Sequence, residues 1–426
     1  MIRHIFKIIW NERKTNFWIV TEYVIVFCIL WFCFDYMYFI GKAYHEPLGF
    51  DLNNTYSISM TKKSPKEYPP GYEIERPTME DEYSYVMTLI ERLKRYPGVE
   101  NVGISFGSMP FSRLYMRVDY AINADTVVQH MRMRNVSSEF FDVFRIKIDN
   151  GEIFDWTDPA SKDQVLISPD RNGFFGDPKK SAHLISEVRK LGREINSDSK
   201  IDIIGITKKI KSSPFEPYNN TIFYPLTKSE TNMSCEITIR IHPNATKGFE
   251  ERFAEDMKEQ LNIGPYKLSR ISSLKQEQKN YLTTIEIIHL NGVYSITLFL
   301  IINVFLGVIG TFWYRTESRR SEIGLRIALG SSKRKIKSFL YSETIFLLLI
   351  SAFIGVNICI NIGQTDILTA IGIPKADPIV IGSGVEQYFI NFGLTFLFLA
   401  AISILAVWYP TRQTSNLHPA DVLHEE

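Results

Sequence analysis

The sequence has few of the features on which secreted disulfide-rich domains depend. It contains only four cysteines among 426 residues, and three of them, Cys28, Cys33 and Cys359, lie inside long apolar runs. Cys235 is then the only cysteine in the polar part of the chain. We therefore expect no disulfide bond within that part.

Motifs for catalysis, nucleotide binding and metal binding are missing as well. The phosphate loop G-x-x-x-x-G-K-[ST] does not occur, and neither do H-E-x-x-H, paired C-x-x-C or G-x-S-x-G. The eight histidines are scattered without metal-ligand spacing, and the formal net charge of +1 provides no basic surface of the kind that binds nucleic acid. We therefore expect no catalytic, cofactor-binding or metal-binding residues, no nucleic-acid partner, and no enzymatic activity of this chain's own.

Four long apolar runs are the main feature that the sequence does contain. Each is long enough to cross the hydrocarbon core of a bilayer, which takes about 20 residues in a helix. A buried helix in a soluble domain is the alternative for any single run, but four such runs with charged flanks favour membrane spans. The predicted transmembrane helices cover residues 17–40, 291–314, 339–363 and 388–409. No small-x-small cleavage site follows the first run, so we expect it to remain as an anchor.

The distribution of basic residues predicts which segments face the cytoplasm, because cationic flanks are retained there. The loop 315–338 carries eight Lys and Arg against two acids, whereas the loop 364–387 carries one Lys. Residues 1–16 are basic and repeat apolar side chains at helical spacing, which predicts an interfacial amphipathic helix. We predict that both termini, including the tail 410–426, are cytoplasmic and that residues 41–290 form a large external domain.

The basic loop has an internal pattern that charge alone does not require. Glu322 and Arg326 are spaced for a helical ion pair, and Ile323 and Ile327 share one helix face. Gly330 supplies the left-handed residue at which helices often end, and Ser331 or Ser332 is placed to cap the next helix. The pattern predicts a short helix between two spans; a charge cluster that only sets topology is the alternative.

The external region predicts two β-α-β units at its ends. Residues 55–60 and 100–106 are predicted strands that flank the helix 79–96, for which Thr78 and Asp81 form a capping box. Strands at 236–242 and 266–271 flank a second helix, whose apolar face is formed by Phe249, Phe253, Met257 and Leu261. The middle segment, 111–229, has the pattern of strands and turns. We predict an α+β domain built from 44–110 and 230–280, with a β-rich subdomain inserted at 111–229.

Three acidic residues occur inside the predicted spans. Glu22, Asp35 and Glu343 all lie within one or two helical turns of a predicted membrane edge, where water and snorkelling reduce the cost of a charge. We interpret them as membrane-edge acids. A role in proton-coupled transport is the alternative, but it would require acids nearer the midplane.

Four stretches together resemble the MacB/FtsX family of ABC-transporter permeases. They are RRSEIGLRIALGSSKRKI (319–336), SETIFLLLISAFIG (342–355), VSSEFFDVFRIKIDNGEIF (136–154) and YPTRQTSNLHPADVL (409–423). The first follows the family's R-x-x-E-I-G-x-x-x-A-x-G pattern, and the third departs from the family by having Glu152 where Arg is usual.

The resemblance implies a membrane protein with four transmembrane helices in a one-plus-three arrangement and an external α+β domain. That domain would comprise a split porter-like subdomain (44–110 and 230–280) and an inserted sabre-like one (111–229). It also implies a separate cytoplasmic ATPase that holds ATP and Mg²⁺, and a second permease chain. The predicted ATPase-contacting helix comprises Arg319, Glu322, Ile323, Gly324, Arg326, Ile327, Ala328 and Gly330.

The function that the resemblance implies is mechanotransmission, in which ATP hydrolysis drives a periplasmic conformational change. The expected outcome is export of a periplasmic or outer-leaflet substrate of the antibiotic, peptide or lipoprotein class from the bacterial inner membrane. A periplasmic adaptor, an outer-membrane channel and membrane lipid are further expected partners. The alternative is an FtsX-like signalling or scaffold protein that activates a periplasmic partner such as a cell-wall hydrolase.

Overall fold

The computed structural model describes residues 13–68, 76–112, 116–121, 128–170, 193–194, 201–318, 320–364 and 384–415. The chain divides into two compact units. The helical unit comprises Met1–Gly41 and His289–Glu426, and the outer unit comprises Lys42–Ile288. The N-terminal amphipathic helix and the loop 364–387 predicted from the sequence lie largely outside the described residues.

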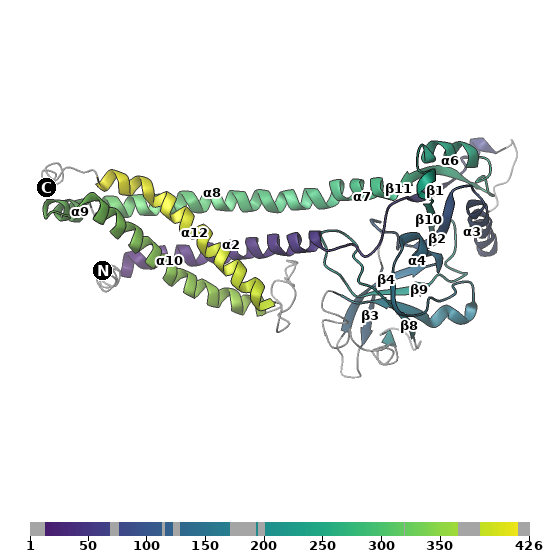
Figure 1. The fold of residues 1–426 in the computed structure, drawn as a ribbon, viewed down its shortest axis with the longest axis horizontal. Helices are drawn as coiled ribbons and strands as arrows, with labels where there is room; N and C mark the ends of the chain where they lie inside the picture. The colour runs from purple at the N-terminus through teal and green to yellow at the C-terminus, as the bar shows by residue number, and fades with distance from the viewer. Residues whose placement is uncertain are drawn as a thin grey trace. The chain divides into compact units, whose positions relative to one another are not determined.

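The helical unit contains four long helices and one short helix among its described residues (Figure 1). They are α2 (Arg13–His45), α8 (Ile287–Ser318), α9 (Arg320–Ala328), α10 (Lys333–Gln364) and α12 (Gly384–Ser415). The four long helices are each long and apolar enough to cross a membrane, over Asn16–His45, Leu290–Tyr314, Lys333–Ile362 and Tyr388–Tyr409. This confirms the prediction of four apolar helices. Each helix extends past its apolar run at one end or at both ends.

Helix α2 contacts the other three long helices of this unit. Its buried residues Tyr23 and Phe27 belong to a core shared with α8, α10 and α12. The Tyr23 hydroxyl donates a 2.8 Å hydrogen bond to Ser403 Oγ of α12. A Cβ on Gly355 of α10 would lie 2.7 Å from the Phe27 ring, so only glycine permits this close approach.

The outer unit is built on one mixed sheet. The described strands run in the order β11-β1-β10-β2-β4-β9-β6-β8-β5, with β3 and β7 paired beside β4. All strand pairs are antiparallel except β4 with β9 and β6 with β8. The strands are β1 (Thr55–Lys62), β2 (Val99–Phe106), β3 (Met116–Ala121), β4 (Val128–Val136), β5 (Ile148–Gly151), β6 (Gln164–Ser168), β7 (Arg193–Glu194), β8 (Asp202–Thr207), β9 (Thr221–Pro225), β10 (Glu236–Ile241) and β11 (Tyr266–Ser273).

The helices of the outer unit are short compared with the membrane-length helices. They are α3 (Met79–Lys94), α4 (Glu139–Phe144), α6 (Phe249–Met257) and α7 (Leu274–Tyr281), with 3-10 turns η1 (Pro65–Glu67), η2 (Pro159–Asp163) and η4 (Pro243–Ala245) and a π-helical turn η5 (Leu282–Glu286). The described part of the unit therefore combines one sheet with helices, which confirms the α+β class.

The two β-α-β units predicted from the sequence are present and interlock. They are β1-α3-β2 and β10-α6-β11, and β1 lies between β10 and β11. The predicted capping box starts α3: Asp81 N donates to Thr78 Oγ1 at 3.2 Å, and Thr78 N donates to Asp81 Oδ2 at 2.9 Å. The side chains of Val86 and Leu89 then face the sheet and are fully buried.

The middle segment differs from the prediction in one respect, because it also contains a helix. Phe140, Phe141 and Phe144 of α4 are 0–1 % exposed and belong to the same core as the end segments. The sheet is likewise continuous, since β2 pairs with β4 through Ser105↔Val136 and its neighbouring residue pair. A six-residue helix is too short to show helical periodicity, which is why the sequence pattern did not reveal it.

Candidate functional site

Helix α9 ends in a hydrogen-bonded cap that fixes the direction of the chain that follows. Gly330 has φ +88°, the left-handed conformation that glycine adopts without strain. Its N–H donates to Ile327 O at 2.9 Å, and Ser331 N donates to Arg326 O at 3.0 Å, which together form a Schellman motif. Ser332 caps the next helix, because its Oγ accepts from Lys335 N at 3.4 Å. The predicted glycine stop is confirmed, and of the two candidate caps Ser332 is the one used.

One face of α9 packs against the first turns of α10. Ile323 is 3 % exposed and contacts a small core with Ile336 and Leu340. The Arg326 guanidinium lies 4.5 Å from the centre of the Phe339 ring, within cation–π range. These contacts hold α9 at a fixed angle to α10. Ile323 is therefore a structural residue within the chain, whereas an anchor for a partner protein would have to be exposed.

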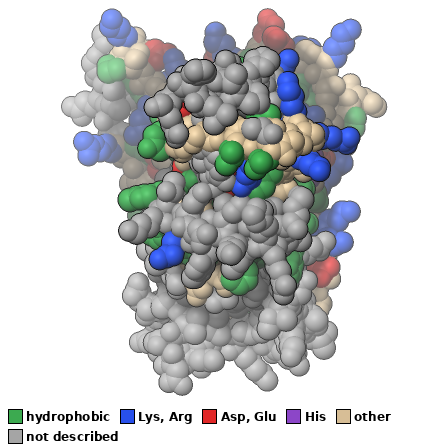
Figure 2. Space-filling view, turned by 90° about the vertical axis from the view of Figure 1, so that its left-hand side faces the viewer, with side chains coloured by type: hydrophobic (Ala, Val, Ile, Leu, Met, Phe, Trp, Pro, Cys, Tyr) green, Lys and Arg blue, Asp and Glu red, His purple; other side chains and the backbone are tan. Residues whose placement is uncertain are grey.

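The opposite face of α9 is exposed and apolar. Leu325 is 52 % exposed, and Leu329, the residue directly after α9, is 79 % exposed. Leu329 N donates to Leu325 O at 2.9 Å, so Leu329 continues the helical spacing and lies on the same side as Leu325. The exposed cations Lys333 and Arg334 follow at the start of α10. In Figure 1, α9 lies at the end of the helical unit where α2 begins and α12 ends. Figure 2 looks onto this end and shows hydrophobic and basic side chains next to each other on the described surface.

The remaining predicted residues of this helix are described only in part. Arg319 lies outside the described residues. Glu322 and Ala328 are in α9, but their side chains are not among those described, so the predicted Glu322–Arg326 ion pair stays a prediction. Gly324 is buried, as expected for a residue on the face that contacts the chain.

Two of the three membrane-edge acids join helices of the unit. Glu22 Oε2 of α2 accepts a 3.1 Å hydrogen bond from Thr311 Oγ1 of α8. Asp35 Oδ1 of α2 accepts a 2.5 Å hydrogen bond from Asn391 Nδ2 of α12. Glu343 of α10 is 2 % exposed, so its carboxylate lies inside the protein. These contacts give Glu22 and Asp35 a role in helix packing.

A buried lysine in the outer unit was not predicted from the sequence. The side chain of Lys211 is 0 % exposed and lies 3.4 Å from Glu46 Oε2. Its ammonium donates to Ala43 O and, at 3.3 Å, to Glu46 O, and it lies 5.1 Å from the centre of the Tyr218 ring. Tyr218 in turn donates a 2.7 Å hydrogen bond to Pro47 O. We call this arrangement the Lys211 clamp; it holds the residues at and just after the end of α2.

The sequence carries no local signal that sets Lys211 apart from its neighbouring lysines. Lys211 follows Ile210, which is 2 % exposed, in the stretch ITKKIKSS, where three lysines look like a solvated charge run. Lysine is seldom buried without a partner, so single-sequence reasoning assigns all three to the surface. Only the tertiary contacts separate the buried lysine from its neighbours.

Comparison with known proteins gives a consistent set of relatives. Residues 294–419 match the family model described as FtsX-like permease C-terminal. The chain is 22 % identical over 303 residues to the macrolide export ATP-binding/permease protein MacB of Neisseria gonorrhoeae, which covers 68 % of this chain and 43 % of that protein. It is 25 % identical over 332 residues to the MacB of Shigella sonnei, which covers 73 % of this chain and 45 % of that protein.

A solved structure is also similar in part. The periplasmic region of MacB from Actinobacillus actinomycetemcomitans matches with a TM-score of 0.32 and 12 % identity, over 57 % of this chain and 99 % of that one. The chain spans less than half the length of the curated relatives it matches. The matched family model includes α9 and the whole of α10, the helices that form the geometry described above.

Proposed function

We propose that this chain is an ABC-transporter permease of the MacB/FtsX family and that it couples ATP hydrolysis by a separate ATPase subunit to a conformational change of its outer unit. The sequence contains no phosphate loop of its own, which is consistent with an energy source in another subunit. In this proposal the protein lies in the bacterial cytoplasmic membrane, with α9 and both termini on the cytoplasmic side and the outer unit in the periplasm.

The observation that carries the proposal is the geometry of α9. A coupling element must be held rigidly by its own chain on one side and must present a surface to its partner on the other. The buried Ile323 and the Gly330 cap supply the first property. The exposed Leu325 and Leu329 supply the second, because interfaces concentrate their binding energy in a few apolar anchors.

Movement would pass to the outer unit along α2 and α8. Helix α2 is continuous from Arg13 to His45, and the Lys211 clamp binds its last turn and the residues after it. Helix α8 begins at Ile287, directly after β11, α7 and η5 of the outer unit. In this proposal the two places where the chain passes between the units, 41–42 in α2 and 288–289 in α8, carry the displacement.

The proposed transported substrate is a periplasmic or outer-leaflet molecule of the antibiotic, peptide or lipoprotein class. The curated relatives are named for macrolide export, and we extend to this chain only the export role. A second permease chain completes the proposed transporter, which makes the working unit a dimer.

The test is co-purification of the ATPase from native membranes. We expect Leu325→Asp and Leu329→Asp each to weaken ATPase binding by about 30-fold or more, since truncating a buried interface anchor costs about 2 kcal/mol or more. Ile153→Asp, an exposed apolar-to-acid change in the outer unit, is the matched control and should leave both co-purification and ATP turnover unchanged.

The substitution Ile323→Asp would not be diagnostic, because Ile323 is buried inside the chain and its loss would displace α9 itself. The proposal is refuted if both leucine variants retain the ATPase at wild-type stoichiometry and turnover. It is also refuted if mass spectrometry of the purified native complex finds no ATPase subunit.

A further inference from the structure

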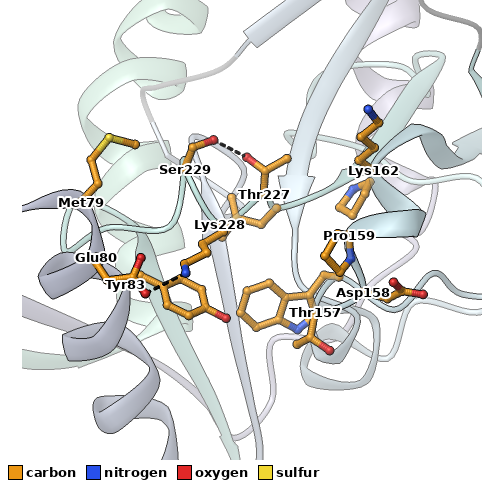
Figure 3. Close-up of a pocket in the computed structure, with 13 residues that line it drawn as sticks. Met79, Glu80, Tyr83, Thr157, Asp158, Pro159, Lys162, Thr227, Lys228 and Ser229 are labelled. Atoms are coloured by element: carbon orange, nitrogen blue, oxygen red, sulfur yellow. Dashed lines mark hydrogen bonds and ion pairs between the residues drawn. The ribbon is translucent and has the colours of Figure 1, made fainter.

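The outer unit contains a cavity of about 500 Å³. Its walls are the start of α3, the turn at 156–162 that contains η2, and residues 225–229, which begin at the last residue of β9 (Figure 3). Small-molecule sites usually measure about 300–1,000 Å³. The cavity therefore has the size of a ligand site, and its three walls come from segments far apart in the sequence.

Six of the 13 lining residues are apolar or aromatic. Tyr83 and Trp156 contribute rings, and Pro159, Pro225 and Leu226 contribute aliphatic surface. Such walls suit a ligand with an apolar body, because binding sites are usually apolar with a few placed polar groups.

Glu80 and Tyr83 form a site for a positive charge, which the protein's own Lys228 occupies; the oppositely charged Asp158 and Lys162 also line the cavity. Lys228 Nζ lies 2.7 Å from Glu80 Oε1 and 5.1 Å from the centre of the Tyr83 ring. In Figure 3 the ammonium points toward both of these groups. A carboxylate and an aromatic face are the two features that recognise organic cations.

The Lys228 ammonium is easily displaced. The Lys228 side chain is 59 % exposed and that of Glu80 is 75 % exposed, and exposed ion pairs contribute little net stability. Lys228 is also attached to a long flexible stem, so its ammonium can move into water while the backbone stays in place. The cation site can therefore be vacated without disturbing the fold.

The walls themselves are held in place by hydrogen bonds. Trp156 Nε1 donates to Glu139 Oε2 at 3.1 Å, and Asp158 Oδ1 accepts from Ala160 N at 2.9 Å. In the third wall, Thr227 Oγ1 donates to Glu230 Oε2 at 2.7 Å. Preorganised walls lower the entropic cost of ligand binding.

We propose that this cavity binds an organic cation with an apolar body, and that Lys228 acts as an internal competitor for it. The ligand's ammonium or guanidinium takes the position of the Lys228 ammonium beside Glu80 and Tyr83, while its apolar part lies against Trp156 and the prolines. A free alkylammonium compound and a basic side chain of a peptide share this chemistry. The inference goes beyond the proposed function, because it concerns equilibrium binding and requires no ATPase.

The test uses the full chain in nanodiscs of zwitterionic lipid, with empty nanodiscs as the blank, and isothermal titration calorimetry. The probes are benzyltrimethylammonium and the peptide acetyl-Phe-Lys-Phe-amide, and the neutral control is the same peptide with norleucine in place of lysine. We expect saturable binding of a cationic probe at one site per chain and weaker binding of the norleucine peptide. Binding of only one cationic probe supports the proposal and identifies the source of the ligand.

Substitution of Lys228 and substitution of the groups that hold its ammonium should change the affinity for cations in opposite directions. Lys228→Met removes the competing ammonium and keeps the stem, so it should tighten cation binding about two- to fivefold, the usual size of an exposed cation–π contribution. Tyr83→Leu and Glu80→Gln should each weaken cation binding by a similar factor. Tyr83→Phe, which keeps the aromatic ring, should retain the wild-type affinity. None of these changes should affect the norleucine peptide by more than a factor of about two.

The direction in which Lys228→Met changes cation affinity also decides whether the proposal fails. If Lys228→Met weakens cation binding or leaves it unchanged, Lys228 is not a competitor and the site is not the one described. The proposal is also overturned if neither cationic probe binds saturably at concentrations up to about 10 mM, because weaker binding than this is not specific. Because Lys228 and Glu80 are exposed, we expect their variants to fold normally. Thermal unfolding midpoints of the variants that equal the wild-type midpoint would verify this.

Discussion

Replacing Lys211 by methionine tests whether the Lys211 clamp alone fixes the residues that follow α2. Methionine keeps the length and apolar character of the stem but removes the ammonium. The change therefore eliminates the hydrogen bonds to Ala43 O and Glu46 O and the contact with the Tyr218 ring. The backbone hydrogen bond from Lys211 N to Leu48 O, at 2.9 Å, is not altered chemically.

The expected loss follows from the lost contacts. A hydrogen bond to a charged group contributes about 1.5–3 kcal/mol, and two are removed. The Glu46 side chain is 21 % exposed, so its carboxylate can regain water and does not become a stranded buried charge. We expect the segment 43–51 to lose about 2–4 kcal/mol of local stability, below the sum of the separate bonds because such losses are not additive.

Hydrogen exchange of the full chain, followed by mass spectrometry, measures this loss directly. The reporter is the Asp51 amide, which donates to Phe144 O at 2.8 Å, together with the other amides of 46–51. Their protection should fall about 30- to 700-fold, since each 1.4 kcal/mol corresponds to a factor of ten. Amides of β10 should be unaffected, because local openings differ in free energy from global unfolding.

Lys208→Met is the matched control, since Lys208 is an exposed cation three residues away. It should leave protection at 46–51 unchanged. The reasoning fails if Lys211→Met leaves that protection intact, or if it lowers protection equally across the whole outer unit, because the clamp would then not be a local device.

Three further predictions concern glycine conformation, thiol reactivity and topology. Gly330→Ala should cost about 1–2 kcal/mol of backbone strain, since its φ is +88° but no atom lies within 4 Å of the added Cβ. Gly49→Ala should cost more, because its Cβ would lie 2.1 Å from Lys209 O. Thermal unfolding midpoints that rank the two variants the other way would contradict this prediction. The Cys235 thiol, whose pKa is raised to about 11 by burial, should stay protonated at pH 8 and resist iodoacetamide in the folded chain, and peptide mapping that finds it fully alkylated there would disprove the burial. An impermeant maleimide should label Thr61→Cys but not Lys335→Cys in intact spheroplasts, and the reverse pattern would invert the proposed orientation.

The elements that could be predicted from the sequence are those that local patterns specify. Helix α3 combines a capping box at Thr78 with a buried stripe at helical spacing, and both signals lie within one segment. The Gly330 stop was predictable for the same reason, because a left-handed residue at a helix end favours glycine wherever the helix packs. The four apolar helices follow from composition alone.

Features that depend on distant contacts could not be predicted. The parallel pairing of β4 with β9 joins residues about 90 positions apart, such as Arg132↔Thr221, and no local pattern specifies that register. Ile323 and Ile327 predicted an apolar face on α9, but the sequence does not say whether that face meets another protein or α10. The structure shows contact with Ile336 and Leu340 of the same chain. Lys211 was missed because burial of a lysine depends on acceptors more than 160 residues away in the sequence.

The position of β1 in the sheet has a consequence for the biogenesis of the protein. Thr55–Lys62 pairs with β10 and β11, so its last partner strand ends at Ser273. About 210 residues must be made between the two, which takes about 10–40 s at 5–20 residues per second. Until β10 is made, both edges of β1 lack their native partners, whereas β6, β8 and β9 can pair with one another once residue 225 is reached. Unpaired strand edges invite aggregation, so a holdase chaperone that covers extended apolar segments should bind nascent chains that end between residues 62 and 236, and should release those that extend beyond 273.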